Sequence, residues 1–326
     1  MPRPRPVAAL LAAALVLSAG CEQDIPEGDW EAGGAVAITG GLVFTSPLVD
    51  PIENGVVVIL DGIIEAVGPA GEVPVPPGAE RIQAGGLSVL AGFWNSDVWI
   101  DDELLDIAEE GTDEELRLAL EERFTRFGFT TVVDHGSDFG ELAPLLDRLG
   151  PGGVRGPRIV QTGGRLPPGV HRAGWWHGME GEVGLEGMAL GDVALMPALT
   201  LASFPGEGES DASTAARTDA AIAAVGRFTG DGGALVFGTG AGYVPEFDPG
   251  LEVMLLDEAG VGFEVMLAAL TSEAAGRFDH GYTGLVEPGM VADLVLLEGD
   301  PATDLTAFER VRWVLREGVA IYAPRR

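Results

Sequence analysis

Apolar residues near the N-terminal end of the chain fall in two short runs that are separated by a turn sequence. Residues 56–60 (Val-Val-Val-Ile-Leu) and residues 63–67 (Ile-Ile-Glu-Ala-Val) flank the pair Asp61-Gly62. Asp-Gly between two apolar runs is typical of a hairpin with a two-residue turn. We therefore expect an antiparallel β-hairpin here, within a strand-rich segment that extends from residue 35 to residue 90.

The C-terminal end has a similar pattern. Residues 292–297 (Ala-Asp-Leu-Val-Leu-Leu) are apolar except for one aspartate, and residues 311–316 and 319–322 flank a Glu-Gly pair. This pattern predicts one strand followed by a second hairpin. Because strand segments lie both before and after the middle of the chain, we expect residues 35–90 and 281–326 to form one composite β domain, a small β-sandwich.

Helical and strand patterns alternate in the middle of the chain. Residues 101–127 are acidic and have helical periodicity, and Thr112 and Glu115 are spaced as a capping box. The β-branched run at residues 130–133 is typical of a strand. Further helices are expected at residues 142–149, 214–228, 251–259 and 265–275, and strands near residues 95, 131, 159, 194 and 236. This alternation predicts a parallel sheet or barrel of the α/β class.

The first 21 residues have the features of a lipoprotein signal peptide. Arg3 and Arg5 precede an Ala/Leu/Val run at residues 7–17 that is too short to span a bilayer. Leu-Ser-Ala-Gly-Cys then ends at Cys21 and resembles a bacterial lipobox, whose cysteine carries the lipid. Cys21 is the only cysteine, so disulfides and thiolate metal sites are excluded from the mature chain. Residues 22–34, rich in Gly, Pro and acidic side chains, are expected to be a flexible tether.

The net charge bears on nucleic-acid binding, and the predicted signal peptide bears on where the protein is located. The chain has 19 basic residues, all arginine, and 51 acidic residues, for a net charge of −32. Without the two arginines of the signal peptide, 17 basic residues remain against 51 acidic ones, or −34. A surface this negative repels phosphate backbones, so nucleic acid is excluded as a partner. We expect a lipid-anchored protein of the bacterial cell envelope, on the outer membrane facing the periplasm, because Glu22 rather than an aspartate follows the lipidated cysteine.

Six motifs follow one another along the chain, at residues 54–68, 91–93, 127–134, 156–159, 237–242 and 284–301. The second reads Ala-Gly-Phe and the third reads Phe-Gly-Phe-Thr-Thr-Val-Val-Asp. In this order they resemble the amidohydrolase superfamily, in particular its imidazolonepropionase-like branch of metal-dependent hydrolases. The resemblance covers most of residues 35–322 and implies a TIM-like (β/α) barrel over residues 91–280. Because roughly 170 residues lie between Asp97 and the end of the last predicted barrel helix, where a complete barrel takes about 200 or more, we expect the barrel to be shortened and incomplete.

The resemblance also implies where the family holds one or two divalent metal ions such as zinc. The first barrel strand of the family ends in His-x-His, and the last ends in Gly-Thr-Asp, whose aspartate is a ligand and the general base. This chain has Asp97, Trp99 and Gly240 at the corresponding positions. An indole offers no lone pair to a metal, and glycine has no side chain. We therefore expect no metal cofactor and no catalytic residues, in a family whose members hydrolyse carbon–nitrogen bonds other than peptide bonds.

Six other residues are candidates for a pocket at the barrel mouth: Asp134, His135, His171, His177, Trp175 and Trp176. The histidines could form a replacement metal site together with Asp97 and Asp134. Alternatively, they could be ordinary surface or hydrogen-bonded residues. Their spacing matches no helical ligand pair and no shared strand face, which favours the second alternative. The tandem tryptophans lie in a loop-like stretch, residues 164–193. They either stack on a ligand or fill the space left by missing strands, and the cost of exposing two indoles favours filling.

Three interpretations follow from the sequence. The first is a non-catalytic lipoprotein, a pseudoenzyme, that binds a small molecule or a partner protein at the barrel mouth. The second is an active metal-dependent amidohydrolase with a rebuilt site. The third is a fragmentary gene product without a stable barrel. The simultaneous loss of several independent contributors to the metal site favours the first interpretation.

Overall fold

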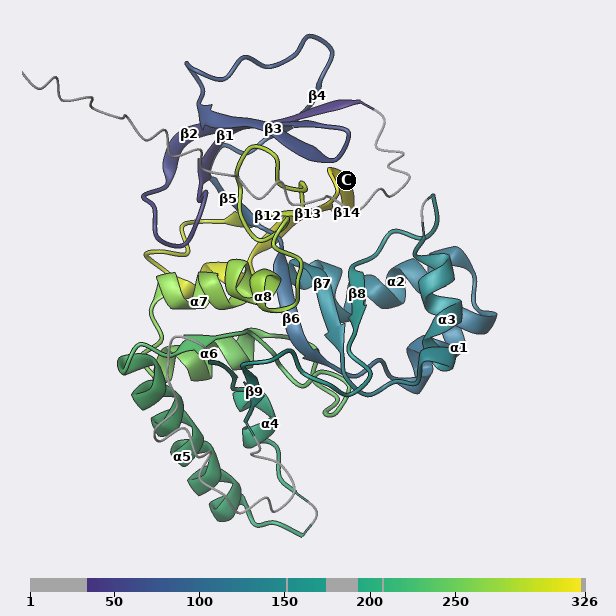
Figure 1. Cartoon of the computed structure of the whole chain (residues 1–326), viewed down its shortest axis with the longest axis vertical. Helices are drawn as coiled ribbons and strands as arrows, with labels where there is room; N and C mark the ends of the chain where they lie inside the picture. The colour runs from purple at the N-terminus through teal and green to yellow at the C-terminus, as the bar shows by residue number, and fades with distance from the viewer. Residues whose placement is uncertain (1–33, 151, 174–192, 207, 324–326) are drawn as a thin grey trace, which may run out of the picture.

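The computed structural model describes residues 34–150, 152–173, 193–206 and 208–323. Cys21 with the predicted signal peptide and tether, and three of the pocket candidates (Trp175, Trp176 and His177), lie outside these residues. Within the described residues, no helix is both long and apolar enough to cross a membrane. Figure 1 shows an α/β arrangement in which one sheet lies at the top and the helices lie below and beside it.

Both ends of the chain contribute to one eight-stranded sheet. Its order is β14-β13-β12-β5-β1-β2-β3, and β4 also pairs with β1. The strands are β1 (Ala35–Val43), β2 (Ile52–Leu60), β3 (Ile63–Pro69), β4 (Glu80–Gln83), β5 (Leu87–Ala91), β12 (Leu294–Glu298), β13 (Val311–Arg316) and β14 (Val319–Tyr322). The two ends of the chain therefore meet through the antiparallel pairing of β12 with β5. The division of the chain into a separate β domain and a barrel domain stays a prediction.

The N-terminal hairpin has the predicted turn. β2 and β3 pair antiparallel with Leu60 opposite Ile63. Asp61 and Gly62 between them have φ values of 48° and 81°. Two successive residues with positive φ are what a tight hairpin turn requires, and Asp-Gly is a pair that adopts them at low cost. The local sequence therefore fixes the register of this part of the sheet.

Six short parallel strands form the middle of the fold. β6 (Phe93–Val98), β7 (Phe129–Asp134) and β8 (Arg158–Gln161) make one three-stranded sheet. β9 (Val170–Arg172), β10 (Ala194–Met196) and β11 (Ala234–Leu235) make another. Val236 N donates to Leu195 O (3.0 Å) and Ser96 N donates to Phe237 O (2.7 Å), so the segment after β11 joins the two sheets. Between β8 and β9 no backbone hydrogen bond is formed by the described residues, so these strands form an open array there.

One predicted loop contains a strand. Residues 164–193 are loop-like in sequence, yet Val170–Arg172 pairs in parallel with Ala194–Met196. A run of three residues is too short for a period-two pattern to be read, and its pairing partner lies more than twenty residues away along the chain. Tertiary pairing therefore creates β9 where local sequence predicts none.

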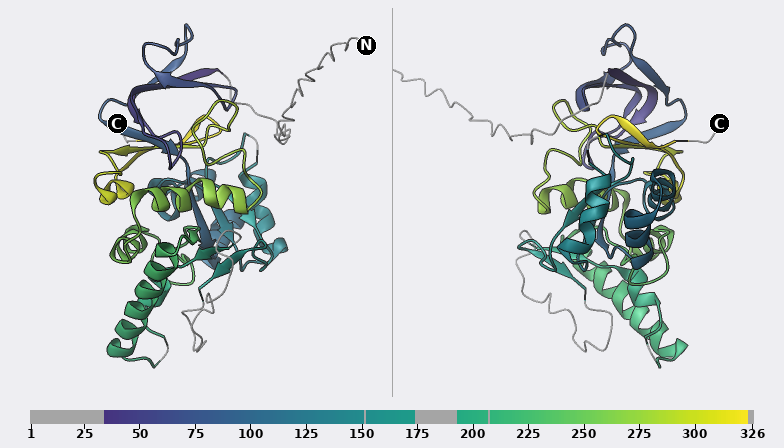
Figure 2. Two further views of the ribbon diagram at one scale, coloured as in Figure 1. Left: turned by 60° about the vertical axis from the view of Figure 1, so that its left-hand side comes forward. Right: turned by 90° about the vertical axis from the view of Figure 1, so that its right-hand side faces the viewer.

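The helices surround the parallel strands and occupy the lower part of the molecule. They are α1 (Asp102–Glu110), α2 (Asp113–Arg123), α3 (Phe139–Arg148), α4 (Leu199–Ser203), α5 (Asp211–Gly230), α6 (Gly250–Glu258), α7 (Phe263–Leu270) and α8 (Ser272–Arg277). The predicted helix at residues 265–275 is broken at Thr271, whose φ of −133° and ψ of −94° are not helical. The capping box of Thr112 and Glu115 is formed at the start of α2. Figure 2 shows that α5 extends away from the eight-stranded sheet.

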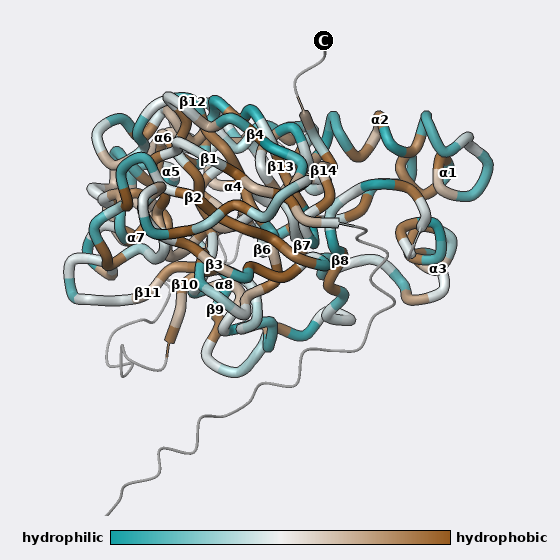
Figure 3. The backbone as a smooth tube through the Cα atoms, turned by 90° about the horizontal axis from the view of Figure 1, so that it is seen from above, coloured by the Kyte–Doolittle hydropathy of each residue, from teal (hydrophilic) through white to brown (hydrophobic). Residues whose placement is uncertain are grey.

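A hydrophobic cluster fills the interior behind the ends of the parallel strands. Trp94 of β6 stacks on Phe278, which follows α8, with ring centroids 6.2 Å apart. Val133 of β7 and Met196 of β10 belong to the same fully buried cluster. Figure 3 shows the apolar strands in the middle of the fold and hydrophilic segments on the outer helices. This packing fixes the carboxyl ends of β6, β7, β9 and β10, where side chains of several strands converge.

Candidate functional site

An ion pair lies where the carboxyl ends of the parallel strands converge. Asp97 is near the end of β6, Arg172 ends β9, and Arg172 Nε donates to Asp97 Oδ2 at 3.0 Å. Asp97 is fully buried, and the Arg172 side chain is 31% exposed. Burial raises the pKa of Asp97 to about 6, while the charge and hydrogen bond of Arg172 oppose the rise. A guanidinium supplied by the protein therefore neutralises the carboxylate at this position.

The guanidinium packs against Tyr243, which in turn contacts Trp99. Arg172 Cζ lies 4.4 Å from the centroid of the Tyr243 ring, which places the cation over the ring face. The Trp99 ring meets Tyr243 edge-on, with centroids 4.9 Å apart and an interplanar angle of 85°. Trp99 is 40% exposed, so this stack forms the outer surface of the site. Cation–π contact of this kind contributes about 0.5–2 kcal/mol and holds the Arg172 side chain in one orientation.

Gly240 follows the last parallel strand, and the space beside it is filled by Leu201. A Cβ placed on Gly240 would lie 2.3 Å from Leu201 Cγ. The Gly240 backbone has a φ of +70°, a conformation that residues with side chains rarely adopt. Leu201 of α4 is itself buried. Neither the space nor the backbone at position 240 therefore suits a side chain that points into the site.

Asp134 closes the turn after β7. Its carboxylate accepts hydrogen bonds from Ile100 N (3.1 Å), Ser137 N (3.1 Å) and Ser137 Oγ (2.9 Å). The side chain is fully buried. Three donors occupy most of the capacity of the carboxylate, so Asp134 acts as a structural residue that links β7 to the loops beside it.

His135 is held between two neighbouring strands. Its Nε2 lies 2.6 Å from Ser96 O and its Nδ1 lies 2.8 Å from Thr162 Oγ1. Because a carbonyl oxygen only accepts, Nε2 carries the proton and Nδ1 is left to accept from the threonine hydroxyl. Burial lowers the pKa of His135, which favours this neutral form. Both ring nitrogens are therefore engaged within the protein.

His171 is separated from the ion pair although it is the neighbour of Arg172. Successive side chains of a strand point to opposite faces, and Arg172 occupies the face that reaches Asp97. His171 is paired with Leu195 of β10 and is partly exposed. Of the residues predicted from the sequence, Asp97 contacts Arg172 directly and Trp99 is connected to Arg172 through Tyr243. Asp134 and His135 make other hydrogen bonds. His171 lies on the opposite face of its strand.

A second buried carboxyl group, Glu252 of α6, caps the start of α4. It accepts hydrogen bonds from Leu199 N (3.0 Å), Thr200 N (2.6 Å) and Thr200 Oγ1 (2.9 Å). Burial raises the pKa of Glu252 to about 7 despite these donors, and the negative charge of Asp97 adds to the rise. Glu252 thus positions the helix that carries Leu201 and is electrostatically linked to the ion pair.

These residues do not fit a metal ion. A zinc site uses at least three protein ligands. No group of three His, Cys, Asp or Glu side chains in the described part of the chain is arranged to hold an ion. Asp97 is paired with a guanidinium, and both nitrogens of His135 are hydrogen-bonded. The arrangement instead accommodates a permanent cation of the protein itself.

Sequence reasoning missed four residues of this site: Arg172, Tyr243, Leu201 and Glu252. Arg172 lies in a strand of three residues, and Leu201 and Tyr243 have the sequence character of ordinary core and loop residues. Of these four residues, only Glu252 could have been recognised from the sequence, because it is an acidic residue inside the apolar helical run Leu-Glu-Val-Met-Leu-Leu. A buried charge at a core position of a helix indicates a polar partner on another element.

Comparison with known proteins adds a set of fold relatives. No family model matches the chain, and no curated protein matches it in sequence. Among solved structures, a putative prolidase from Bifidobacterium longum superposes with a TM-score of 0.70 at 18% identity, over 90% of this chain and 96% of the other. A Xaa-Pro dipeptidase with bound methionine in its active site has a TM-score of 0.69 at 14% identity, over 89% of this chain and all of the other.

A third similar structure is that of molinate hydrolase, with a TM-score of 0.62 at 16% identity. The match covers 88% of this chain and 94% of that enzyme. Identities this low establish a shared fold and carry no information about activity. The chain therefore shares its overall fold with these proteins.

Proposed function

Because the chain has the fold of the amidohydrolase superfamily, we propose that it is a lipid-anchored member of that fold which acts by binding and not by metal-assisted hydrolysis. The observation that carries this proposal is the pairing of Arg172 with Asp97. In a metal hydrolase the cation at such a place polarises water and generates hydroxide. A guanidinium keeps its protons throughout the physiological range and has no open coordination position, so it cannot generate hydroxide.

The surroundings of the ion pair support the same proposal. Leu201 occupies the space beside Gly240 where a catalytic carboxylate would need to stand. Tyr243 packs against the guanidinium of Arg172, and Trp99 packs edge-on against Tyr243. The aromatic pair and the partly exposed guanidinium form a surface suited to recognition, since aromatic faces and guanidinium groups contribute strongly to binding. A shortened barrel with this mouth, and a small β domain built from both chain ends, is the architecture that we propose.

The location is part of the proposal. Cys21 follows small residues and an apolar run, which supports lipidation of this cysteine and attachment to the cell envelope, with the outer membrane facing the periplasm as the preferred site. Multiple acyl chains on one residue anchor a protein stably. Residues 22–34 then separate the lipid from the folded part.

A second candidate is hydrolysis of a carbon–nitrogen bond, and the fold itself is the observation that favours it. The similar structures include a Xaa-Pro dipeptidase and a molinate hydrolase. This candidate requires a catalytic set that differs from the family arrangement at residues 97, 99 and 240.

Turnover measurements on the mature chain distinguish the two candidates. Purified residues 22–326 are incubated with Xaa-Pro dipeptides, N-acyl amino acids and cyclic amides, with and without added zinc or manganese. We expect no product above the level of an Asp97→Asn variant in either condition. Metal-dependent turnover that disappears in Asp97→Asn would establish the hydrolase instead.

A further inference from the structure

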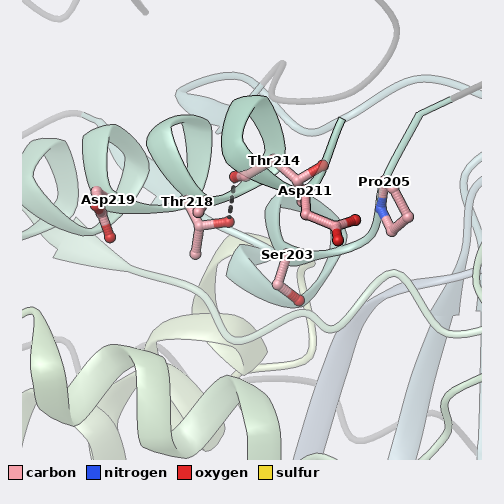
Figure 4. A pocket seen from close by; sticks show the side chains of 7 residues that line it. Ser203, Pro205, Asp211, Thr214, Thr218 and Asp219 are labelled. Carbon is pink, nitrogen blue, oxygen red and sulfur yellow. Dashed lines mark hydrogen bonds between the residues drawn. The ribbon is translucent and has the colours of Figure 1, made fainter. Parts of the chain in front are cut away.

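A pocket lies between the end of α4 and the N-terminal half of α5, and it shares no residue with the Arg172–Asp97 pair. Its volume is about 390 Å³. One face of α5 forms its long wall: Asp211, Thr214, Ala215, Thr218 and Asp219. Figure 4 shows Asp211, Thr214, Thr218 and Asp219 along the helix, with Ser203 and Pro205 on the side of α4. The pocket is therefore elongated along the axis of α5.

The two acidic residues stand at opposite ends of this wall. They are eight residues apart on one helix, which separates their backbone positions by about 12 Å along the helix axis. The intervals between the five wall residues are three, one, three and one residues, the spacing of a single helical face. Between the two carboxylates the wall presents a methyl group, from Ala215, and two threonines.

Neither carboxylate is neutralised by the protein. Asp211 and Asp219 are exposed, and no ion pair or hydrogen bond of either side chain is formed in the described part of the chain. Arg217, the arginine of α5 that lies between the two aspartates in the sequence, is engaged elsewhere. Its guanidinium pairs with Glu209 and donates to Phe204 O (2.6 Å) and Ala202 O (3.2 Å). The pocket thus keeps two free negative charges.

Thr214, one of the residues that line the pocket, has a buried hydroxyl group without a partner among the described residues. Thr214 is 8% exposed, and its Oγ1 has no hydrogen-bond partner within the described residues. The neighbouring Thr218 hydroxyl is satisfied, because its single proton can be donated to Ala202 O or to Thr214 O, both 2.9 Å from Oγ1. A buried hydroxyl without a partner is costly. A rotation about χ1 exchanges the Thr214 hydroxyl with its methyl group and presents the oxygen to the pocket.

We propose that this pocket binds a linear aliphatic diamine, with one ammonium group at Asp211, the other at Asp219 and the methylene chain between them. Ammonium N–H groups donate to carboxylates in strong, charge-assisted hydrogen bonds. Thr214 Oγ1 accepts from the ammonium near Asp211, which lies one helical turn away. Ala215 and Pro205 contact the methylenes. The net charge of −32 concentrates small cations around the protein and assists capture.

A single divalent cation fits the pocket less well. Calcium binds six to eight oxygens at about 2.3–2.6 Å, so two carboxylates about 12 Å apart cannot share one ion. Among the described residues that line the pocket there is no third carboxylate. A ligand whose two charges are separated by several methylenes matches both the length of the wall and the position of its charges.

Titration calorimetry on the mature chain with a series from ethanediamine to decanediamine, in 0.15 M salt, tests the proposal. We expect saturable one-to-one binding that is strongest at intermediate lengths, from pentane- to octanediamine. Hexylamine, with one ammonium, is expected to bind at least about tenfold more weakly than hexanediamine. Affinity that is independent of chain length, or equal for the monoamine, would overturn the proposal and indicate general attraction to an acidic surface.

Substitutions in the pocket test whether the diamine binds at Asp211 and Asp219. Asp211→Asn and Asp219→Asn are each expected to weaken hexanediamine binding by about tenfold or more, and Thr214→Val by a few fold. Asp257→Asn, an exposed residue of α6 outside the pocket, is the matched control and is expected to leave affinity unchanged. Melting curves verify that each variant is folded. Folded Asp211→Asn and Asp219→Asn variants with unchanged affinity would contradict the proposed site.

Discussion

Arg172 and Asp97 form an ion pair between two strands that are 75 residues apart in the sequence, with Arg172 Nε 3.0 Å from Asp97 Oδ2. The carboxylate is fully buried, and the guanidinium is partly exposed beneath Tyr243. The carboxylate needs its partner because an isolated buried charge is costly. Removing either partner would therefore leave an uncompensated charge in the site.

Loss of the guanidinium should destabilise the protein. We expect Arg172→Met to lower the free energy of unfolding by about 1–3 kcal/mol, below the range for fully buried pairs because Arg172 is partly exposed. Urea unfolding at pH 8, where Asp97 is ionised, measures the loss. Arg165→Met, at an exposed position of the loop before β9, is the control. A variant as stable as the parent would mean that the pair contributes little.

Restoring a carboxylate at position 240 should fail to rebuild the family site. Gly240→Asp places a Cβ 2.3 Å from Leu201 Cγ on a backbone with a φ of +70°. We expect a loss of stability of about 2 kcal/mol or more. Gly260→Asp is the control for backbone strain alone, since Gly260 has a φ of +81° and open space around it.

A double-mutant cycle separates the collision from the strain. Because Leu201→Ala opens the space beside residue 240, the combined Gly240→Asp/Leu201→Ala variant should lose less stability than the sum of the two single losses. Additive losses in the cycle would show that the two positions do not compete for the same space.

Stability should fall as the pH rises from 5 to 8. Asp97 and Glu252 have folded-state pKa values of about 6 and about 7, above their ordinary values of 3.8 and 4.5. At pH values between the ordinary and the raised pKa, each carboxyl group keeps its proton in the folded state but has lost it in the unfolded state. Their contribution is therefore complete below about pH 4 and is lost as the pH passes about 6 and then about 7, by about 1–3 kcal/mol for each group.

Glu252→Gln tests which group causes this dependence. The amide oxygen can still accept from the α4 backbone but does not titrate, so the slope of unfolding free energy against pH should flatten between pH 6 and pH 8. Glu258→Gln, an exposed residue of the same helix, should leave the slope unchanged. Identical slopes in the parent chain and in Glu252→Gln would show that another group is responsible.

Lipidation at Cys21 can be measured directly. We expect the full-length protein, expressed in bacteria that are fed labelled palmitate, to incorporate the label, and Cys21→Ser to lose it completely. Glu22→Gln should keep the label, because it leaves the cysteine in place. Label retained in Cys21→Ser would place the lipid elsewhere or exclude this form of anchoring.

Local sequence predicted the elements whose signals are local. The Asp61-Gly62 turn, the capping box of Thr112 and the alternation of helices with strands are all present. These features depend on φ preference, on one reciprocal hydrogen-bond pair and on periodicity, which a short window of residues contains.

The candidate site depended on contacts that no local pattern encodes. Asp97, Trp99 and Gly240 could be chosen because a strand motif marks their positions. Arg172 belongs to a strand of three residues that exists only through pairing with β10. Leu201 could not be predicted either. It matters only because it fills the space beside Gly240, which lies 39 positions later in the sequence.

The metal content of the purified mature chain tests the central claim most directly. Residues 22–326 are loaded with zinc, manganese or iron, dialysed and analysed by mass spectrometry, in parallel with Asp97→Ala. Because Asp97 is already paired with Arg172, we expect far less than one ion per chain and no difference between the two proteins. One ion retained per chain, and lost in Asp97→Ala, would contradict this account.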